Sequence, residues 1–160
     1  MLILGVDPGL KATGYGLVGL SDQKLKVFEA GSFEPKQKND IEVRLQKIHV
    51  MLTKLVQQYR PQLVVLEKLY AHYKHPLTAS KLGHVRGVIC LCCAENKIPI
   101  HEYSVKRIRK AVVGNGNATK IQTRQVVSEI LSIDPEVLTL DASDALALAV
   151  GYSYINRVSI

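Results

Sequence analysis

The feature that most constrains this chain is a short apolar run that ends in an acid and a tight turn. Residues 2–6 read Leu-Ile-Leu-Gly-Val, and Asp7 follows them, then Pro8 and Gly9. A run of this length closed by Pro-Gly is typical of a buried strand that enters a turn. A carboxylate is costly at the end of a buried strand unless a positive group binds it. We therefore expect Asp7 to have a cationic partner.

Three more acids lie in similar apolar surroundings. Glu67 ends the apolar run 63–66, and Asp141 and Asp144 open the apolar segment 145–150. On a helix, a spacing of three residues puts two side chains on one face, with Cβ atoms roughly 5–6 Å apart. Both aspartates would lie near a helix N-terminus, where the helix dipole favours a carboxylate. Four acids on three separate elements favour a divalent-metal site.

The chemistry of these acids indicates which metal they would hold. Carboxylate oxygens suit Mg²⁺, for which Mn²⁺ can substitute, and do not favour Zn²⁺. Two such ions roughly 3.5–4 Å apart can activate water and stabilise the leaving oxygen in phosphodiester hydrolysis. We therefore expect two ions per active site. The alternative is that Asp141 caps a helix, Asp144 is hydrated and the strand-end acids face water; the repetition on three elements argues against it.

Charge balance narrows the class of partner. The chain has 21 Lys and Arg against 14 Asp and Glu, a net charge of +7. Such a balance favours a polyanion, and nucleic acid is preferred to a membrane because no basic amphipathic helix with aromatic anchors is evident. No apolar stretch approaches the roughly 20 residues that span a bilayer. No basic segment precedes the first apolar run, so we expect a cytoplasmic protein without a signal peptide.

Residues 104–124 are the strongest candidate for phosphate binding. The segment contains no acid, and Gly114 and Gly116 would let backbone amides approach a phosphate. Its length favours phosphate binding over an ordinary solvated basic face. Its basic residues are Lys106, Arg107, Arg109, Lys110, Lys120 and Arg124.

Residues 69–75, Leu-Tyr-Ala-His-Tyr-Lys-His, follow Glu67 closely. Aromatic side chains interleaved with bases suit stacking on nucleic-acid bases, so Tyr70 and Lys74 are candidate DNA contacts. The alternative is that a tyrosine packs beneath the loop.

Three cysteines cluster at 90, 92 and 93 within an apolar segment. No second Cys or His pair lies at zinc-finger spacing, so these thiols are expected to act as small apolar side chains in a buried helix.

The pattern of elements predicts one α/β domain over residues 1–160. Strands are expected at 2–7, 12–20, 25–34, 63–67 and 98–103. Helices are expected at 41–59, 78–96, 105–113, 118–132 and 141–156, with a loop at 69–77. The first three strands are joined by short turns and should be antiparallel, whereas helical crossovers make the later pairs parallel. The fold is therefore a mixed five-stranded sheet with helices on both faces.

Taken together, the motifs resemble the RuvC-type Holliday junction resolvases, in order and over nearly the whole chain. The segments that carry the resemblance are Asp7-Pro8-Gly9, Thr13-Gly14-Tyr15-Gly16, Glu67, Lys81-Leu82-Gly83, Arg86-Gly87, Val112-Val113-Gly114 and Asp141-Ala142-Ser143-Asp144-Ala145-Leu146-Ala147. The resemblance implies a ribonuclease-H-like fold, a homodimer, and paired magnesium-dependent incisions across a four-way DNA junction. It also implies a branch-migration motor complex as a partner.

Individual roles follow from matching positions. Asp7, Glu67, Asp141 and Asp144 match the catalytic acids of these resolvases, although some relatives have His in place of Asp141. Tyr70 matches an aromatic residue proposed to stack at the opened junction. Arg109 and Lys120 match basic positions near the scissile phosphate, the former being lysine in some members.

Three other functions fit parts of the pattern. A ribonuclease-H-like nuclease could act on other branched DNA or on RNA–DNA hybrids. A junction-binding module without activity would not need four intact acids. An ATP-binding domain of the actin and sugar-kinase type also begins with a strand, an acid and a glycine-rich hairpin, but that architecture needs two such domains.

For the dimer, the candidate interface is the helix segment with Val85, Val88, Ile89 and Cys92, which could instead be core.

Overall fold

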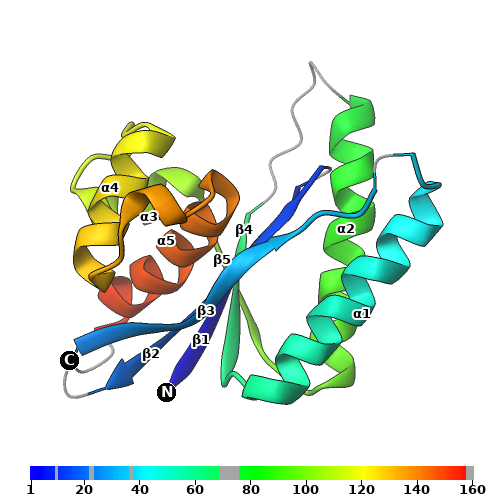
Figure 1. Cartoon of the computed structure of the whole chain (residues 1–160), viewed down its shortest axis with the longest axis horizontal. Helices are drawn as coiled ribbons and strands as arrows, with labels where there is room; N and C mark the ends of the chain where they lie inside the picture. Colours follow the sequence, from blue (N-terminus) through cyan, green and yellow to red (C-terminus); the bar gives the residue numbers. More distant parts are fainter. Residues whose placement is uncertain (10, 22–23, 37, 69–75, 158–160) are drawn as a thin grey trace.

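A computed structural model shows one mixed sheet with helices on both of its faces (Figure 1). It describes residues 1–9, 11–21, 24–36, 38–68 and 76–157. The sheet order is β3-β2-β1-β4-β5. The strands are β1 Leu2–Asp7, β2 Thr13–Ser21, β3 Lys24–Phe33, β4 Leu63–Glu67 and β5 Ile100–Tyr103. The pairs β1–β2 and β2–β3 are antiparallel, and β1–β4 and β4–β5 are parallel, which confirms the predicted mixed sheet.

The helices divide into two groups. On one side of the sheet lie α1 Ile41–Tyr59 and α2 Pro76–Glu95. On the other lie α3 Val105–Val113, α4 Lys120–Leu131 and α5 Leu140–Ile155 (Figure 1). A short 3₁₀ helix, Pro135–Val137, precedes α5 and was not predicted. Within the described residues, no helix is long and apolar enough to cross a membrane.

Most predicted element boundaries differ from the observed ones by one or two residues. The prediction of a loop through residue 77 is wrong, because α2 begins at Pro76. Proline is compatible with the first turn of a helix, where its missing N–H would have no partner within the helix. Strand β5 begins at Ile100 and not at residue 98. Asp40 precedes α1 as expected, but its side chain makes no capping hydrogen bond.

Alternation along β1 and β4 separates two cores. Leu4, Val6, Val64 and Leu66 pack with α1 and α2, whereas residues 3, 63 and 65 pack with the helices of the opposite face. Because successive side chains of a strand point to opposite faces, Asp7 and Glu67 belong to the face that carries α5. The acids therefore lie on one face of the sheet.

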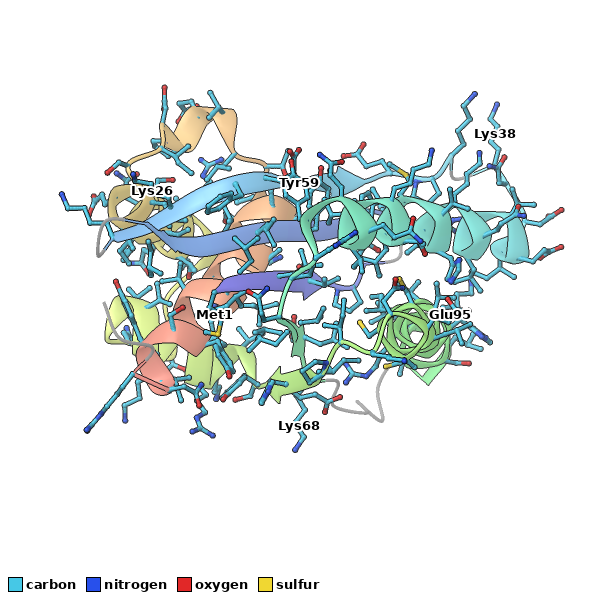
Figure 2. The ribbon with its side chains drawn as sticks, turned by 90° about the horizontal axis from the view of Figure 1, so that it is seen from below. Met1, Lys26, Lys38, Tyr59, Lys68 and Glu95 are labelled. Carbon is cyan, nitrogen blue, oxygen red and sulfur yellow. The ribbon has the colours of Figure 1, made fainter. Side chains whose placement is uncertain are left out.

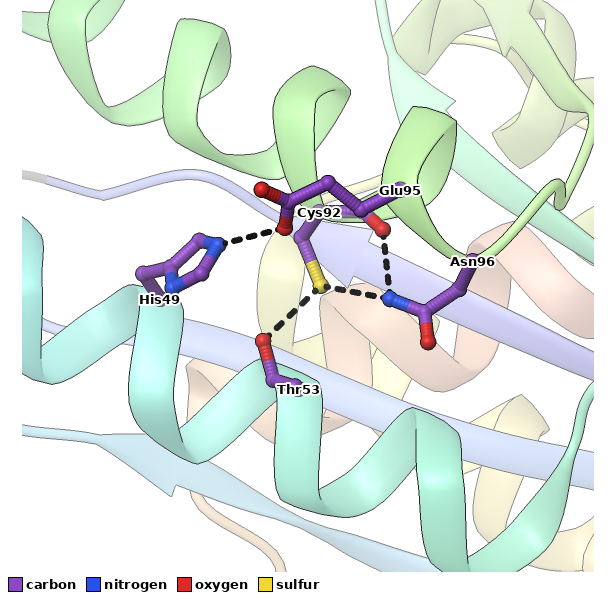
Figure 3. Close-up of polar contacts among 5 residues, drawn as sticks. All are labelled: His49, Thr53, Cys92, Glu95 and Asn96. Carbon is purple, nitrogen blue, oxygen red and sulfur yellow. Dashed lines mark hydrogen bonds and ion pairs between the residues drawn. The ribbon is translucent and has the colours of Figure 1, made fainter.

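Polar contacts join the middle of α1 to the C-terminal end of α2 (Figure 3). His49 Nε2 lies 2.9 Å from Glu95 Oε2, and Thr53 Oγ1 lies 3.4 Å from Cys92 Sγ. The Asn96 amide donates to the Cys92 carbonyl. Viewed from below, the two helices lie together beside the sheet, and basic side chains such as Lys38 project outward (Figure 2).

The cysteines behave as predicted. All three are free thiols, and Cys92 and Cys93 are buried. Burial raises the pKa of the Cys93 thiol to about 12, with smaller contributions from Cys92 and Cys90, so the group stays neutral. Cys92 and Cys93 therefore act as small apolar side chains of the core beneath α2.

The predicted dimer interface needs correction. Val85, Ile89 and Cys92 are fully covered within this one chain and pack against α1 and the sheet. Val88 is only partly covered. Periodic apolar residues indicate that one face of a helix is buried, but they do not show what buries it. Here that face is buried by the core of the same chain.

Candidate active site

The parallel pairing of β1 with β4 brings two of the four acids together. In the register Val6 lies beside Leu66, so the next residues, Asp7 and Glu67, end neighbouring strands at the same edge. Both side chains are half-buried. The prediction that these two strands are neighbours is confirmed.

Close packing of α5 on the sheet brings the other two acids near this edge. A Cβ atom added at Gly5 would clash with the Ala145 carbonyl, and one added at Gly14 would clash with the backbone of Asp141. Only glycine permits this approach of a helix backbone to a strand. Thr139 caps the helix by accepting from the Ala142 N–H. As a result, Asp141 and Asp144 stand in the first turns of α5, beside the ends of the strands.

Three of the acids line one hollow of about 200 Å³. Lys120 and Arg109 line it as well, together with the buried Thr123. Asp141 is not part of this lining, but its charge acts on Lys120. The full lining is Asp7, Glu67, Val105, Ile108, Arg109, Lys120, Thr123, Asp144, Ala147 and Leu148.

Burial and the crowding of carboxylates set the electrostatics of this hollow. Burial, followed by the charges of Glu67 and Asp144, raises the pKa of Asp7 to about 8, against a smaller lowering by Lys120. Burial lowers the pKa of Lys120, but its ion pair with Asp144 and the charges of Asp7 and Asp141 outweigh that effect and raise it. The three acids that line the hollow therefore outnumber the two cations that line it, Lys120 and Arg109.

This donor set fits a divalent cation in its chemistry. The acids offer hard oxygen atoms, and burial beside two other carboxylates, which raises the pKa of Asp7, favours a cation as partner of its ionised form. In the arrangement shown, no three His, Cys, Asp or Glu side chains of the described segments are grouped closely enough to hold a metal. Lys120 occupies part of the space, with its Nζ 2.5 Å from Asp144 Oδ2.

The structure divides the basic segment 104–124 into different environments. Arg109 and Lys120 line the acidic hollow, and Arg109 also lines an adjoining one with Lys106 and Asn117. Arg107 instead lies over the Tyr103 ring, 5.1 Å from its centroid. Arg124 reaches the Leu138 carbonyl at 3.4 Å. The segment is thus partly structural, and its hollow-facing members are the candidates for phosphate contact.

Tyr70 and Lys74, the predicted stacking and DNA-binding residues of the loop, lie outside the described residues. Two residues without a predicted role support the site, one by lining the hollow and one by contacting the main chain of an acid. Thr123 is buried and donates to the Thr119 carbonyl. Arg86 donates to the main-chain carbonyl of Glu67. The sequence feature that could have indicated a role for Arg86 is its charge, which stands among apolar residues of α2.

A mixed sheet of this order, with acids ending β1 and β4 and opening α5, defines the ribonuclease-H-like class of nucleases. The family model described as "Crossover junction endodeoxyribonuclease RuvC" matches residues 3–152. The chain belongs to this RuvC family. The RuvC of Citrifermentans bemidjiense is 37% identical over 154 residues, covering 96% of this chain and 93% of that protein. The RuvC of Chloroherpeton thalassium is 40% identical over 149 residues, covering 93% and 80%.

Solved structures establish the same fold. The Thermus thermophilus RuvC structure superposes with a TM-score of 0.88 at 24% identity, covering 99% of this chain and 96% of that one. The structure of T. thermophilus RuvC in complex with a Holliday junction substrate gives a TM-score of 0.89 at 23% identity with the same coverage. These comparisons confirm the predicted ribonuclease-H-like fold and the predicted family.

Proposed function

We propose that this chain is a structure-selective endonuclease that resolves four-way DNA junctions during recombination and repair. It makes paired, symmetric nicks and works in the cytoplasm as a single nuclease domain over residues 1–160. The observation that carries this proposal is the hollow in which Asp7, Glu67 and Asp144 face Lys120 and Arg109. Family membership supports the choice of substrate. A hollow lined by carboxylates and flanked by cations suits a phosphodiester approached by metal.

Nucleases of this family depend on a metal, and we assign the role to Mg²⁺, with Mn²⁺ as a substitute and two ions per site. Asp7, Glu67, Asp141 and Asp144 would hold the ions. When bound, they supply a nucleophilic water and stabilise the charge that develops on the leaving oxygen. The protein contributes the fixed strand ends and the first turns of α5, which keep the four acids at one edge of the sheet.

In this proposal Lys120 pairs with Asp144 in the free protein and with a phosphate when DNA is bound. Without metal, its ammonium group pairs with Asp144 and offsets part of the acidic charge. A bound metal would compete with Lys120 for Asp144, and a DNA phosphate would compete with Asp144 for Lys120. Arg109, which also lines the hollow, provides a second cation for the same strand.

Contacts away from the hollow complete the proposed interface with DNA. Lys106 and Asn117 continue the lining beyond Arg109 and provide a path for the next phosphate of the strand. Tyr70 stacks on a base exposed at the junction centre, and Lys74 contacts the backbone nearby. A branch-migration motor complex delivers the junction.

A homodimer is proposed because two symmetric cuts need two sites related by a twofold axis. The exposed stripe of α2 is the candidate contact, since its buried face is occupied by core. Leu77 and Leu91 are 78% and 53% exposed. The other exposed members of the stripe are Ser80, His84, Gly87 and Ala94. Sedimentation at micromolar concentration should show twice the 17.7 kDa chain mass, and Leu91→Asp should weaken that species. An active 17.7 kDa species would contradict the dimer.

The function is tested with labelled four-way junctions, flaps, duplexes and RNA–DNA hybrids, each with and without Mg²⁺. Cleavage of the four-way junction alone, at symmetric positions on opposing strands, is the expected result. Preferential cleavage of flaps or hybrids would favour the broader ribonuclease-H-like activity. Junction binding with no cleavage under any metal would favour a non-catalytic binding module.

A further inference from the structure

Arg86 makes an unusual pair of contacts behind the acidic hollow. It lies on α2, on the opposite face of the sheet from α5, and its side chain is 16% exposed. Its Nη1 donates to the main-chain carbonyl oxygen of Glu67 at 2.6 Å, and its Nη2 pairs with the Glu102 carboxylate on β5. One guanidinium thus ties α2 to the ends of two strands.

The Glu67 carbonyl needs this donor because of the residue that follows Asp7. The β1–β4 register places Val6 beside Leu66, which puts Pro8 where β1 would offer its next N–H to Glu67. Proline has no N–H, so the parallel ladder cannot satisfy this carbonyl. Pro8, Glu67 and Arg86 line the same small gap at the strand ends, together with Leu82. The Arg86 guanidinium therefore supplies the hydrogen bond that a main-chain N–H at position 8 would otherwise donate to the Glu67 carbonyl.

The other side of β4 is also held at this point. The Lys68 N–H donates to the Tyr103 carbonyl at 2.8 Å, so β5 holds the main chain directly after Glu67. On the β1 side, the hydrogen bond from Arg86 holds the Glu67 carbonyl. The Glu102 carboxylate in turn keeps the Arg86 guanidinium in place. Removing Arg86 would leave the Glu67 carbonyl without its donor and would free the last residue of β4 to move.

We propose that Arg86 is a positioning residue that fixes the main chain of Glu67 and so aims its carboxylate at the metal in the hollow. This inference rests on the proposed function, in which Glu67 is a metal ligand. Partners that orient a metal ligand typically change metal affinity or activity by 10–100-fold when they are removed. Arg86 does not touch the hollow itself, so its loss should alter the metal requirement while leaving DNA binding intact.

The test compares Arg86→Met, Arg86→Lys and a matched charge control, Lys54→Met on the exposed side of α1. Three quantities are measured: the Mg²⁺ concentration for half-maximal junction cleavage, the rise in melting temperature on adding Mn²⁺, and junction affinity without metal. Arg86→Met should raise the Mg²⁺ requirement roughly tenfold and reduce the Mn²⁺-induced stabilisation. Junction affinity should match wild type. Arg86→Lys should fall between, because one ammonium cannot reproduce the planar fork.

An unchanged Mg²⁺ requirement and unchanged Mn²⁺ stabilisation in Arg86→Met would overturn the inference. So would a loss of junction affinity as large as the loss of rate, since that indicates a DNA contact. If Arg86→Met does not fold, a wild-type metal requirement in Arg86→Lys overturns the inference equally. A wild-type protein that shows no Mg²⁺-dependent junction cleavage would instead defeat the proposed function, so the two failures are distinct.

Discussion

Lys120 Nζ lies 2.5 Å from Asp144 Oδ2, at the rim of a hollow that Asp7 and Glu67 also line. The lysine side chain is 51% exposed and the aspartate 15%, so the ammonium approaches from solvent toward a mostly covered carboxylate. A half-exposed ion pair of this kind contributes little to stability, on the order of 1 kcal/mol or less. Its consequence is functional, because whatever binds the acids must compete with Lys120.

Asp7→Asn should abolish junction cleavage, a loss greater than roughly 1000-fold, while leaving junction affinity largely intact. The substitution removes a ligand charge from the end of β1 but does not alter the basic residues that contact phosphate. Cleavage rate and affinity are measured on the same labelled junction. Cleavage retained in Asp7→Asn or in Asp144→Asn at physiological Mg²⁺ would rule out the assignment of these acids as metal ligands.

Lys120→Met should slow cleavage by roughly 100-fold, because a cation beside the scissile phosphate is lost. The same change removes the competitor of the metal at Asp144, so the variant should bind Mn²⁺ more tightly than wild type. Titration of Mn²⁺ binding, followed by the paramagnetic signal of the free ion, separates these two effects. Weaker Mn²⁺ binding in Lys120→Met would show that the ion pair does not oppose the metal. Lys110→Met, exposed on α3, is the charge control for the affinity measurement.

Without metal, the stability of the protein should fall as pH rises from about 4 to about 8. Burial, and then the charges of Glu67 and Asp144, raise the pKa of Asp7 from 3.8 to about 8. Within that window the folded state keeps a proton that the unfolded state has released, so the free energy of unfolding decreases with pH. Above the folded pKa the decrease levels off. Mg²⁺ should oppose the loss, because a ligand that binds only the folded state stabilises it.

Asp7→Asn tests this assignment directly. Denaturant unfolding in EDTA at about pH 8 should show the variant more stable than wild type, by on the order of a few kcal/mol. At about pH 4 most of the difference should disappear, because this pH is close to the unfolded-state pKa of 3.8 and lies far below the folded-state pKa. Glu42→Gln, an exposed acid on α1, is the control. If the free energy of unfolding depends on pH in the same way in wild type and in Asp7→Asn, the raised pKa does not belong to Asp7.

Tyr70→Ala should slow cleavage of an intact junction much more than cleavage of a junction already unpaired at its centre. Stacking on an unpaired base contributes roughly 1–3 kcal/mol, and an open junction no longer needs that contribution. Tyr70→Phe should resemble wild type, because the ring face and not the hydroxyl makes the contact. An equal loss on both substrates would assign Tyr70 a packing role instead.

Local patterns in the sequence were sufficient to predict the elements and to single out the four acids as candidates. A strand has a period of two and a helix a period near 3.6, so both kinds of element can be recognised from apolar spacing. An acid directly after a buried run, as with Asp7 and Glu67, is unusual because of the cost of burying charge. The three-residue spacing of Asp141 and Asp144 predicts a shared helix face, and both stand in the first turns of α5. These features depend only on neighbours along the chain.

Contacts between distant segments were decided by the tertiary structure. Spacing could not show that Lys120 meets Asp144, that Arg107 lies over Tyr103, or that Arg86 reaches the Glu67 carbonyl. Each contact depends on how α2, α3, α4 and α5 pack on the sheet. The start of α2 at Pro76 also escaped prediction, since a proline marks a loop and a helix N-terminus equally well.

The apolar residues of α2 show the same division between local and tertiary information. Their spacing predicted a covered helix face, but core and dimer interface have identical periodicity. Only the packed structure shows that Val85, Ile89 and Cys92 are covered by α1 and the sheet of the same chain. The sequence by itself determined which side chains are buried and which acids stand beside buried runs, where an unpaired charge is costly. The tertiary structure decided which residues those side chains contact, because the partners come from distant segments whose approach no local pattern encodes.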